Sequence, residues 1–238
     1  QNSPDFMYTN IYRRGHGDGS LTAGGGFLNA EIPIKGKTSF YAFGGYNGKK
    51  SDAYAFTRNW SARPERFPTD NNWNLIYVPS VMKVTADDTT FSPHIQTNVS
   101  DFSMATGVRG ISNGGLNWDI SNTIGRNNFH FYGDKTFNAS LGPNQTHFDD
   151  GGFSFLQNTI NANFSKELNA KTNLAFGAEY RYERYNLYAG EEASYKNFSP
   201  NKFFTDSNGD DIYVAGGAQG FPGYQPSDEV TANRSVIG

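Results

Sequence analysis

The sequence predicts an all-β chain in which about six antiparallel strands follow one another up and down. Its 238 residues include 37 aromatic residues, 27 Gly and only 28 Leu, Ile and Val together. That composition is typical of strands and turns rather than of a helical bundle. Several segments alternate apolar and polar residues with a period of two, as half-exposed strands do. The connections between them are alternately short and long.

The alternation is clearest in two segments. In Leu116–Ile124 the apolar residues Leu116, Trp118, Ile120 and Ile124 share one parity, and the odd positions hold Asn, Asp, Ser and Thr. Residues 174–182 repeat this plan, with Glu179 and Arg181 on the polar side. Four more segments follow it loosely, namely Gly26–Ile34, Phe40–Tyr46, Asp101–Ile111 and Phe153–Phe164. Partial strands are expected at Phe6–Arg13 and Val230–Gly238.

The connections predict a membrane barrel rather than a sandwich. Three are short and polar, as hairpin turns are, at 35–38, 112–115 and 169–172. Three are long and irregular, at 57–92, 134–152 and 189–231. A soluble sandwich has no reason to place every long loop at one end, whereas an outer-membrane barrel has short periplasmic turns and long extracellular loops. We therefore expect a segment of an up-and-down transmembrane β-barrel.

The spacing of charges agrees with a lipid-facing band. On the apolar parity, Leu116 is followed ten residues later by Arg126, and Leu174 ten residues later by Arg184. Ten tilted residues climb roughly 23 Å, close to the lipid-facing height of about 25 Å. The polar parity would then line a watery lumen. Because closed bacterial barrels have at least about eight strands, six strands predict part of a larger barrel.

Several stretches together resemble the barrel region of TonB-dependent outer-membrane receptors, particularly the Bacteroidota-type group. They are NAEIPIKGKTSFYAFGGYNGKKSDAYAFTRN, FSPHIQTNVSDFSMATGVRG, FHFYGDKTFNASLG, THFDDGGFSFLQNT, LAFGAEYRYERYNLYAGEEASY and GAQGFPGYQPSDEV. The resemblance implies a 22-stranded barrel in the bacterial outer membrane, with a plug domain that contacts TonB. We expect residues 1–238 to be an interior part of such a barrel, without the plug and the remaining strands.

The same resemblance implies a function. Such receptors capture a scarce nutrient, such as a ferric siderophore, an oligosaccharide or a peptide, at their outer loops and import it with energy relayed by TonB. The expected partners are therefore outer-membrane lipid, the plug, the other barrel strands, TonB and the nutrient.

Other classes of function find little support. The 20 basic and 23 acidic residues are scattered, which predicts no nucleic-acid partner. No nucleophile elbow, zinc-protease motif or phosphate loop is present, so we expect no enzyme and no cofactor. The histidines His16, His94, His130 and His147 are dispersed, so we expect no metal site. Asp206, Asn208 and Asp210 have calcium-loop spacing, but Asp211 replaces the required Gly, which favours an ordinary turn.

One long loop carries the candidate ligand-binding residues. Three guanidinium groups lie near three large aromatic side chains along residues 58–77, at Arg58, Arg63, Arg66, Trp60, Trp73 and Tyr77. Such a mixture holds polar, anionic or partly aromatic ligands by stacking and bidentate contacts. The rings alternatively pack the loop against its neighbours, and the sequence leaves both interpretations open. A secreted soluble β-sandwich with a carbohydrate-binding or adhesion function is the alternative to the receptor.

Overall fold

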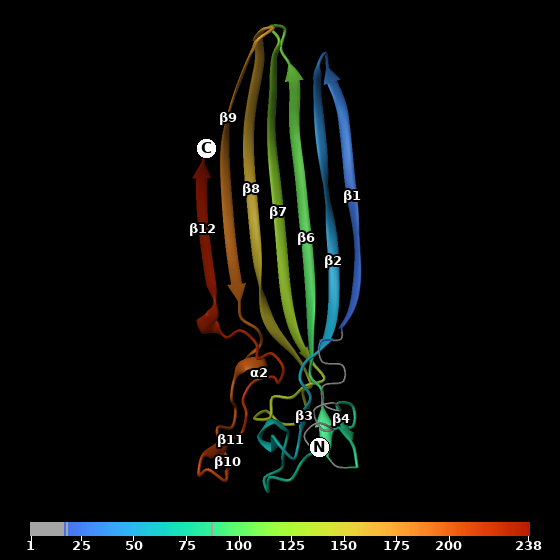
Figure 1. The fold of residues 1–238 in the computed structure, drawn as a ribbon, viewed down its shortest axis with the longest axis vertical. Coiled ribbons are helices and arrows are strands. Elements are labelled where there is room, and N and C mark those ends of the chain that lie inside the picture. The colour runs from blue at the N-terminus through green and yellow to red at the C-terminus, as the bar shows by residue number, and fades with distance from the viewer. Residues whose placement is uncertain (1–16, 18, 87) are drawn as a thin grey trace, which may run out of the picture.

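The computed structural model describes residues 17, 19–86 and 88–238, and it confirms the all-β prediction. Seven strands form one antiparallel sheet in the order β1-β2-β6-β7-β8-β9-β12 (Figure 1). Sequence neighbours within the sheet are also neighbours in space, which is the up-and-down order that we expected. The seventh strand, β12, is the partial strand predicted at Val230–Gly238. The other predicted partial strand, Phe6–Arg13, lies outside the described residues.

The sheet strands are long. Their bounds are β1 Gly19–Lys35, β2 Thr38–Tyr54, β6 His94–Ile111, β7 Leu116–Asp134, β8 His147–Asn169, β9 Thr172–Tyr188 and β12 Val230–Ile237. Six of them have 17 to 23 residues, and β12 has eight. The six predicted segments all fall within these strands, but each strand extends beyond the segment that predicted it.

All three long connections leave the sheet at the same end (Figure 1). The first contains the small sheet β3-β5-β4 and one 3-10 turn, with bounds β3 Arg58–Asn59, η1 Pro64–Arg66, β4 Met82–Val84 and β5 Thr89–Phe91. The last contains α2 Glu192–Tyr195, β10 Lys202–Thr205, β11 Asp211–Tyr213 and η2 Pro226–Asp228. In the described part of the chain, the opposite end has only the three predicted tight turns.

We call the half of the sheet next to the tight turns the turn half, and its two surfaces face A, which carries Trp118, and face B, which carries Asp119. Paired residues share a face, and successive residues alternate between faces. In the turn half, face A is mainly apolar, with Leu28, Phe40, Val108, Ile120, Ile124, Ile160, Phe164 and Phe176. Face B is mainly polar there, with Glu31, Ser39, Arg109, Asp119, Ser121, Asn161, Asn163 and Glu179, although Tyr41 and Phe43 interrupt it.

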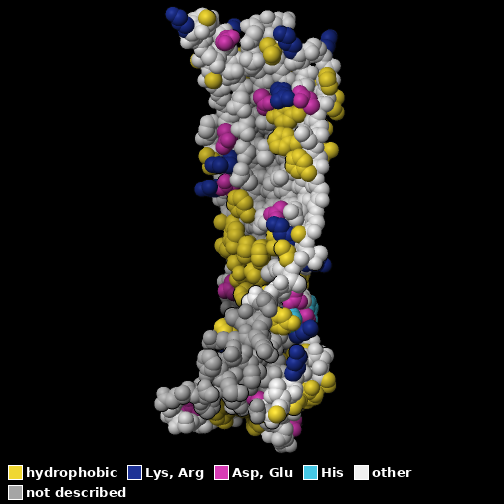
Figure 2. Space-filling model, turned by 45° about the vertical axis from the view of Figure 1, so that its right-hand side comes forward, with side chains coloured by type: hydrophobic (Ala, Val, Ile, Leu, Met, Phe, Trp, Pro, Cys, Tyr) yellow, Lys and Arg dark blue, Asp and Glu magenta, His cyan; other side chains and the backbone are white. Residues whose placement is uncertain are grey.

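The two faces exchange character in the half of the sheet next to the long loops, which we call the loop half. Here face B carries the large apolar and aromatic side chains Val99, Phe129, Phe131, Phe153, Phe155, Tyr185 and Leu187. Face A carries Asp52, Gln96, Asn98, His130, Tyr132 and Asp134. The exchange occurs near Arg126, the residue expected at the end of the apolar band. Figure 2 shows one side of the sheet, with charged side chains gathered near the tight turns and hydrophobic ones near the loops.

This exchange explains why the strands are longer than predicted. In β7 the apolar residues occupy even positions up to Ile124 and odd positions from Phe129 onward. A break in parity resembles the end of a strand, although the backbone pairing continues to Asp134. The connection predicted at 134–152 is therefore only 135–146, and β6 begins at His94 rather than Asp101.

The buried core lies in the loops rather than beneath the sheet. Phe67, Met82, Phe91 and Phe137 form one cluster, and each is at most 2% exposed. By contrast, Ile120 and Phe176 on face A of the sheet are 50% and 56% exposed. The two other sheets of the described residues, with two and three strands, belong to the loops.

Candidate ligand-binding site

The long loops form one packed unit at the end of the sheet. The rings of Phe67 and Phe91 meet edge to face at 4.8 Å, and those of Phe91 and Phe137 at 5.2 Å. Because Phe137 belongs to the connection between β7 and β8, this core joins two of the three long connections. Edge-to-face aromatic pairs add stability beyond the area that they bury.

Buried polar contacts join the third long connection to the same unit. The Asn138 side chain is fully buried and donates hydrogen bonds to the backbone oxygens of Ala193 and Lys196, both at 2.8 Å. Thr136 donates to the backbone oxygen of Gln219 at 2.6 Å, and the Arg66 guanidinium donates to the Gln219 side chain at 3.2 Å. Because a buried polar group is costly without a partner, these contacts fix how the loops sit against one another.

The fold brings the three predicted arginines together. The pKa of Arg58 is lowered, first by burial and then by the positive charges of Arg66 and Arg63. Among the described residues, Glu65 is the only carboxylate paired with them, and it approaches both Arg63 and Arg66 at 3.5 Å. The cluster therefore keeps an excess of positive charge.

One of these guanidinium groups holds a donor with no acceptor. The Nε atom of Arg58 is buried and has no hydrogen-bond partner among the described residues. The Nε atom of Arg66 is also buried and makes no hydrogen bond there, but it forms an ion pair with Oε1 of Glu65 at 3.5 Å. The Nη1 atom of Arg58 is satisfied by the backbone oxygen of Phe56 at 2.7 Å. Guanidinium groups bind carboxylate and phosphate oxygens in bidentate fashion. The arrangement is chemically suited to a polar or anionic group of a ligand.

Of the aromatic residues of the predicted site, one packs inside the loop unit and two are available for ligand contact. Trp60 packs against the loop core and meets the Phe67 ring edge to face at 5.6 Å. Trp73 and Tyr77 are 38% and 46% exposed, and Trp73 contacts Phe203 of the last long connection at 4.8 Å. Packing therefore accounts for Trp60, whereas Trp73 and Tyr77 present ring surface to the outside.

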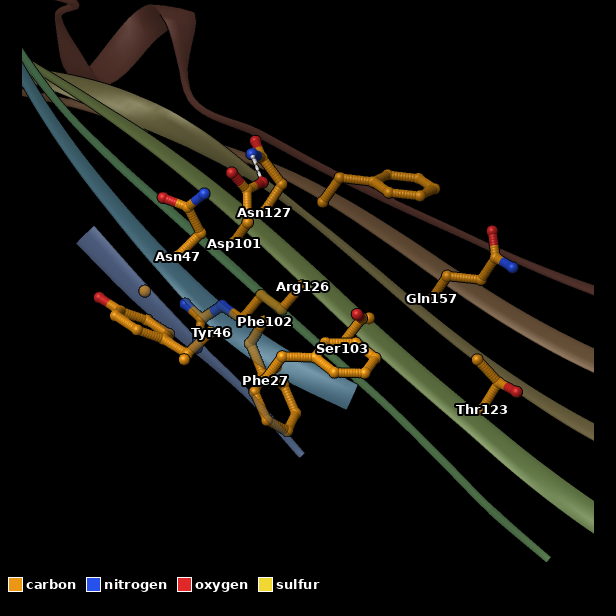
Figure 3. A pocket seen from close by; sticks show the side chains of 15 residues that line it. Phe27, Tyr46, Asn47, Asp101, Phe102, Ser103, Thr123, Arg126, Asn127 and Gln157 are labelled. Carbon is orange, nitrogen blue, oxygen red and sulfur yellow. Dashed lines mark hydrogen bonds between the residues drawn. The ribbon is translucent and has the colours of Figure 1, made fainter. Parts of the chain in front are cut away.

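A second candidate region is a hollow of ≈ 830 Å³ along the middle of the sheet (Figure 3). Gly45, Ser103 and Gly125 are neighbours in one row on face B, so three adjacent strands have little side chain there. Beyond that row, Asp101 accepts a hydrogen bond from Asn127 at 2.5 Å, and both lie on the same side of the sheet in Figure 3. Small residues bordered by amide, carboxylate and aromatic side chains therefore leave an open hollow.

This hollow was not predicted from the sequence. Its glycines are far apart in the chain and come together only through the register of β2 and β7 with β6, which lies between them.

The segment at Asp206, which has calcium-like spacing, forms an ordinary turn. The Oδ1 atom of Asp206 accepts hydrogen bonds from the backbone N–H groups of Asn208 and Asp210, both at 2.9 Å.

Comparison with known proteins gives no match. No family model fits the chain, and no curated protein or solved structure matches it. Among the described residues, no helix has the length and apolar character needed to cross a membrane.

Proposed function

We propose that the chain is part of the wall of a TonB-dependent outer-membrane receptor, which binds a scarce nutrient at its outer loops and imports it. The exchange of apolar character between faces A and B carries this proposal. A wall that crosses a bilayer meets hydrocarbon on its outer face, and that face meets water where the strands extend beyond the bilayer. In this proposal, face A of the turn half contacts lipid and face B faces the lumen.

Polar groups on face A of the turn half agree with a lipid environment. Asn122 and Asn158 are neighbours there, and their side-chain amides donate to each other at 3.1 and 3.2 Å. Asn122 also donates to the backbone oxygen of Thr159 at 3.3 Å. Because hydrocarbon offers no hydrogen-bond partners, polar groups that face it need internal ones.

The outer strands support the proposal that further strands complete the wall. Among the described residues, β1 pairs only with β2, and β12 pairs only with β9. Unpaired backbone N–H and C=O groups are not tolerated in hydrocarbon, which is why membrane sheets close into barrels. We therefore assign the remaining strands, and the plug that contacts TonB, to other parts of the complete receptor.

The loop unit supplies the capture site in this proposal. The excess positive charge around Arg58, Arg63 and Arg66 suits an anionic or strongly polar nutrient, while Trp73 and Tyr77 offer stacking surfaces. A ferric siderophore, an oligosaccharide and a peptide all present such groups. The receptor changes no covalent bond, and TonB provides the energy of import through the plug.

Tryptophan fluorescence tests the position of face A. The chain has three Trp, so the double variant Trp60→Phe/Trp73→Phe leaves only Trp118. In vesicles of brominated lipid we expect strong quenching of this variant, because Trp118 lies on the proposed lipid face. The control variant Trp118→Phe keeps the two loop tryptophans and should be quenched far less. Absence of Trp118 quenching in folded protein would refute the membrane assignment.

The same experiment separates the receptor from the soluble β-sandwich alternative. A carbohydrate-binding or adhesion sandwich needs a second sheet packed over face A or face B, and it would be monodisperse without detergent. Its Trp118 would not be quenched by brominated lipid.

Capture by the loops is tested in the complete receptor. Ferric catecholate chelates, oligosaccharides and oligopeptides are titrated against the wild type and the variant Arg66→Gln. We expect the ligand class that binds to lose about tenfold or more in affinity in this variant, since the charge-assisted contact of this guanidinium group is lost. Unchanged binding would remove the arginine cluster from the proposed site.

A further inference from the structure

A group of metal-ligating side chains lies on face A of the loop half, away from the arginine cluster. Four neighbouring strands contribute to it, with Asp52 from β2, His94 from β6, Asp134 from β7 and His147 from β8. Donor atoms of Asp52, His94 and Asp134 all lie within 4.8 Å of one another. The Nδ1 atom of His147 lies 3.3 Å from Oδ1 of Asp134 but outside the group whose donors are all within 4.8 Å of one another, so this exposed side chain becomes a fourth donor only by turning toward the other three.

The donor atoms of Asp52, His94 and Asp134 are close enough to share one small cation. Ligands at about 2.0–2.1 Å in a tetrahedral zinc site lie roughly 3.3 Å from one another. The His94 Nδ1 and Asp52 Oδ1 atoms are 2.6 Å apart, which is a hydrogen bond that opens slightly when a cation takes the place of its proton. Two imidazole nitrogens with two carboxylate oxygens favour zinc or a similar transition metal over calcium or magnesium, which take oxygen ligands.

The surroundings hold these side chains in place. Gln96 donates from one amide nitrogen to Asp52 at 2.8 Å and to Asp134 at 3.1 Å, which orients both carboxylates. The His94 ring is 6% exposed and packs against Tyr54 at 4.2 Å. Outer contacts of this kind orient metal ligands and are part of metal sites generally.

A cavity gives access to the cluster. It has a volume of ≈ 300 Å³ and is lined in part by Asp52, Tyr132 and His147, and also by Lys50. The Tyr132 ring stacks on His147 at 5.6 Å with an angle of 16°, so the imidazole is held beside the opening. A hydrated ion can therefore reach two of the four donors, those of Asp52 and His147, from the outside.

A β-bulge places the fourth donor. Between Phe131 and Tyr132 of β7 the register with β8 shifts by one residue, and Asp150 is the extra residue. Without that shift, Asp134 would face Phe148 instead of His147. The bulge therefore brings together two side chains that regular pairing would place on opposite faces.

We propose that Asp52, His94, Asp134 and His147 bind one zinc ion, which cross-links β2, β6, β7 and β8 where they leave the sheet for the long loops. The proposal rests on these contacts alone and holds whether or not face A meets lipid. Two carboxylates balance the charge of the ion, and binding releases a proton from any imidazole that is protonated beforehand.

Calorimetric titration of the chelator-treated, tag-free chain with ZnCl₂ tests the site. We expect one ion per chain, with affinity lowered at least tenfold in each of the variants His147→Gln and Asp134→Asn, and a melting temperature that rises with zinc in the wild type only. His130→Gln is the matched control, since His130 lies on the same face and stacks on Tyr132 but is outside the cluster. Circular dichroism without metal confirms that each variant is folded.

The results that overturn the proposal are specific. Absence of zinc binding would refute it, as would binding that His147→Gln and Asp134→Asn leave unchanged. Tighter binding of Ca²⁺ than of Zn²⁺ would also refute it. A His94→Gln variant could fail to fold because the His94 ring is buried. The variant His147→Gln still tests zinc binding in that case, because the His147 side chain is 54% exposed and its loss removes no core contact.

Discussion

The turn half and the loop half of the same sheet place their apolar residues on opposite faces. Ile120 and Phe153 belong to adjacent strands of one continuous ladder, yet Ile120 lies on face A and Phe153 on face B. In the turn half no other layer of the described residues covers face A. In the loop half the aromatic residues of face B are partly covered by the last long connection, where Phe221 meets the Phe131 ring at 5.0 Å.

One strand can therefore present its apolar side chains on opposite faces in its two halves, according to what covers each face. The hydrophobic effect is proportional to the apolar area removed from water, whatever removes it. In the loop half, the chain's own loops cover the aromatic residues. In the turn half, the apolar surface needs a covering from outside the described residues, and our proposal assigns that role to lipid.

The largest expected effect concerns Asp150 in the loop half, outside the proposed bilayer region. Its side chain is fully buried, and neither carboxylate oxygen has a hydrogen-bond partner among the described residues. Burial, followed by the charges of Asp149 and Glu191, raises the pKa of Asp150 to about 8. Between about pH 4 and pH 8 the folded state therefore binds more protons than the unfolded state.

We expect the free energy of unfolding to fall as the pH rises through that window and to level off above it. The total change is at most roughly 6 kcal/mol, at about 1.4 kcal/mol per unit of pKa difference. Asp150→Asn should remove this dependence and stabilise the protein at pH 9, as measured by urea unfolding. Asp206→Asn, in an exposed turn, is the control and should keep it. A wild type with equal stability at pH 5 and pH 9 would contradict a protonated Asp150.

The second effect compares two phenylalanines. Phe137→Ala empties a site in the loop core and should cost about 3–5 kcal/mol of unfolding free energy, because Phe137 is fully buried. Phe176→Ala on face A of the turn half leaves no buried cavity, so we expect a loss below about 2 kcal/mol. Urea unfolding of both variants provides the measurement. Equal losses would mean that a protein layer covers face A.

The third effect distinguishes the two faces at one height of the turn half. In lipid vesicles, Ile120→Lys should lower the free energy of unfolding by about 2–4 kcal/mol, the cost of a cation near the middle of a barrel's lipid face. Ser121→Lys is its matched control on face B and should cost less than about 1 kcal/mol, because that face is hydrated in the proposal. Similar losses for both variants would remove the distinction between a lipid face and a lumen face.

The sequence predicted most of the sheet but not its exchange of faces. The period-two patterns located six strands, because one apolar and one polar face leave a clear alternation, and the short polar connections located all three tight turns. The patterns failed where Phe129 and Phe153 shift the apolar parity, because alternation alone does not distinguish a change of surroundings from the end of a strand. The continuing backbone ladder contains that information, and it depends on pairing partners far away in the sequence.

The candidate sites show the same limit. Arg58, Arg63 and Arg66 were predicted as a group because they are close in sequence, and the loop does bring them together. His94 and His147 were judged to be dispersed, yet the register of four strands and the bulge at Asp150 bring both beside the carboxylate of Asp134. Sites assembled across strands leave no local signal in a single sequence.

The smallest expected effect tests whether face B is hydrated in the turn half. Arg109 and Glu31 form an ion pair at 2.8 Å across β1, β2 and β6, and their side chains are 53% and 49% exposed. Ser39 also donates to Glu31 at 2.7 Å. An exposed ion pair gains little, because water and salt screen the attraction and because both side chains lose conformational freedom.

We therefore expect Arg109→Gln, Glu31→Gln and the double variant to have urea midpoints close to that of the wild type, with a coupling that disappears at high salt. The double variant controls for the loss of each single charge. If face B were instead packed against a dry protein layer, either single variant would leave an unpaired charge in a low dielectric and would be strongly destabilised. Salt screens a buried ion pair only weakly. A large coupling energy between Arg109 and Glu31 that persists in salt would therefore show that face B is not open to water. The exchange of apolar residues between the two faces would then need an explanation other than a membrane.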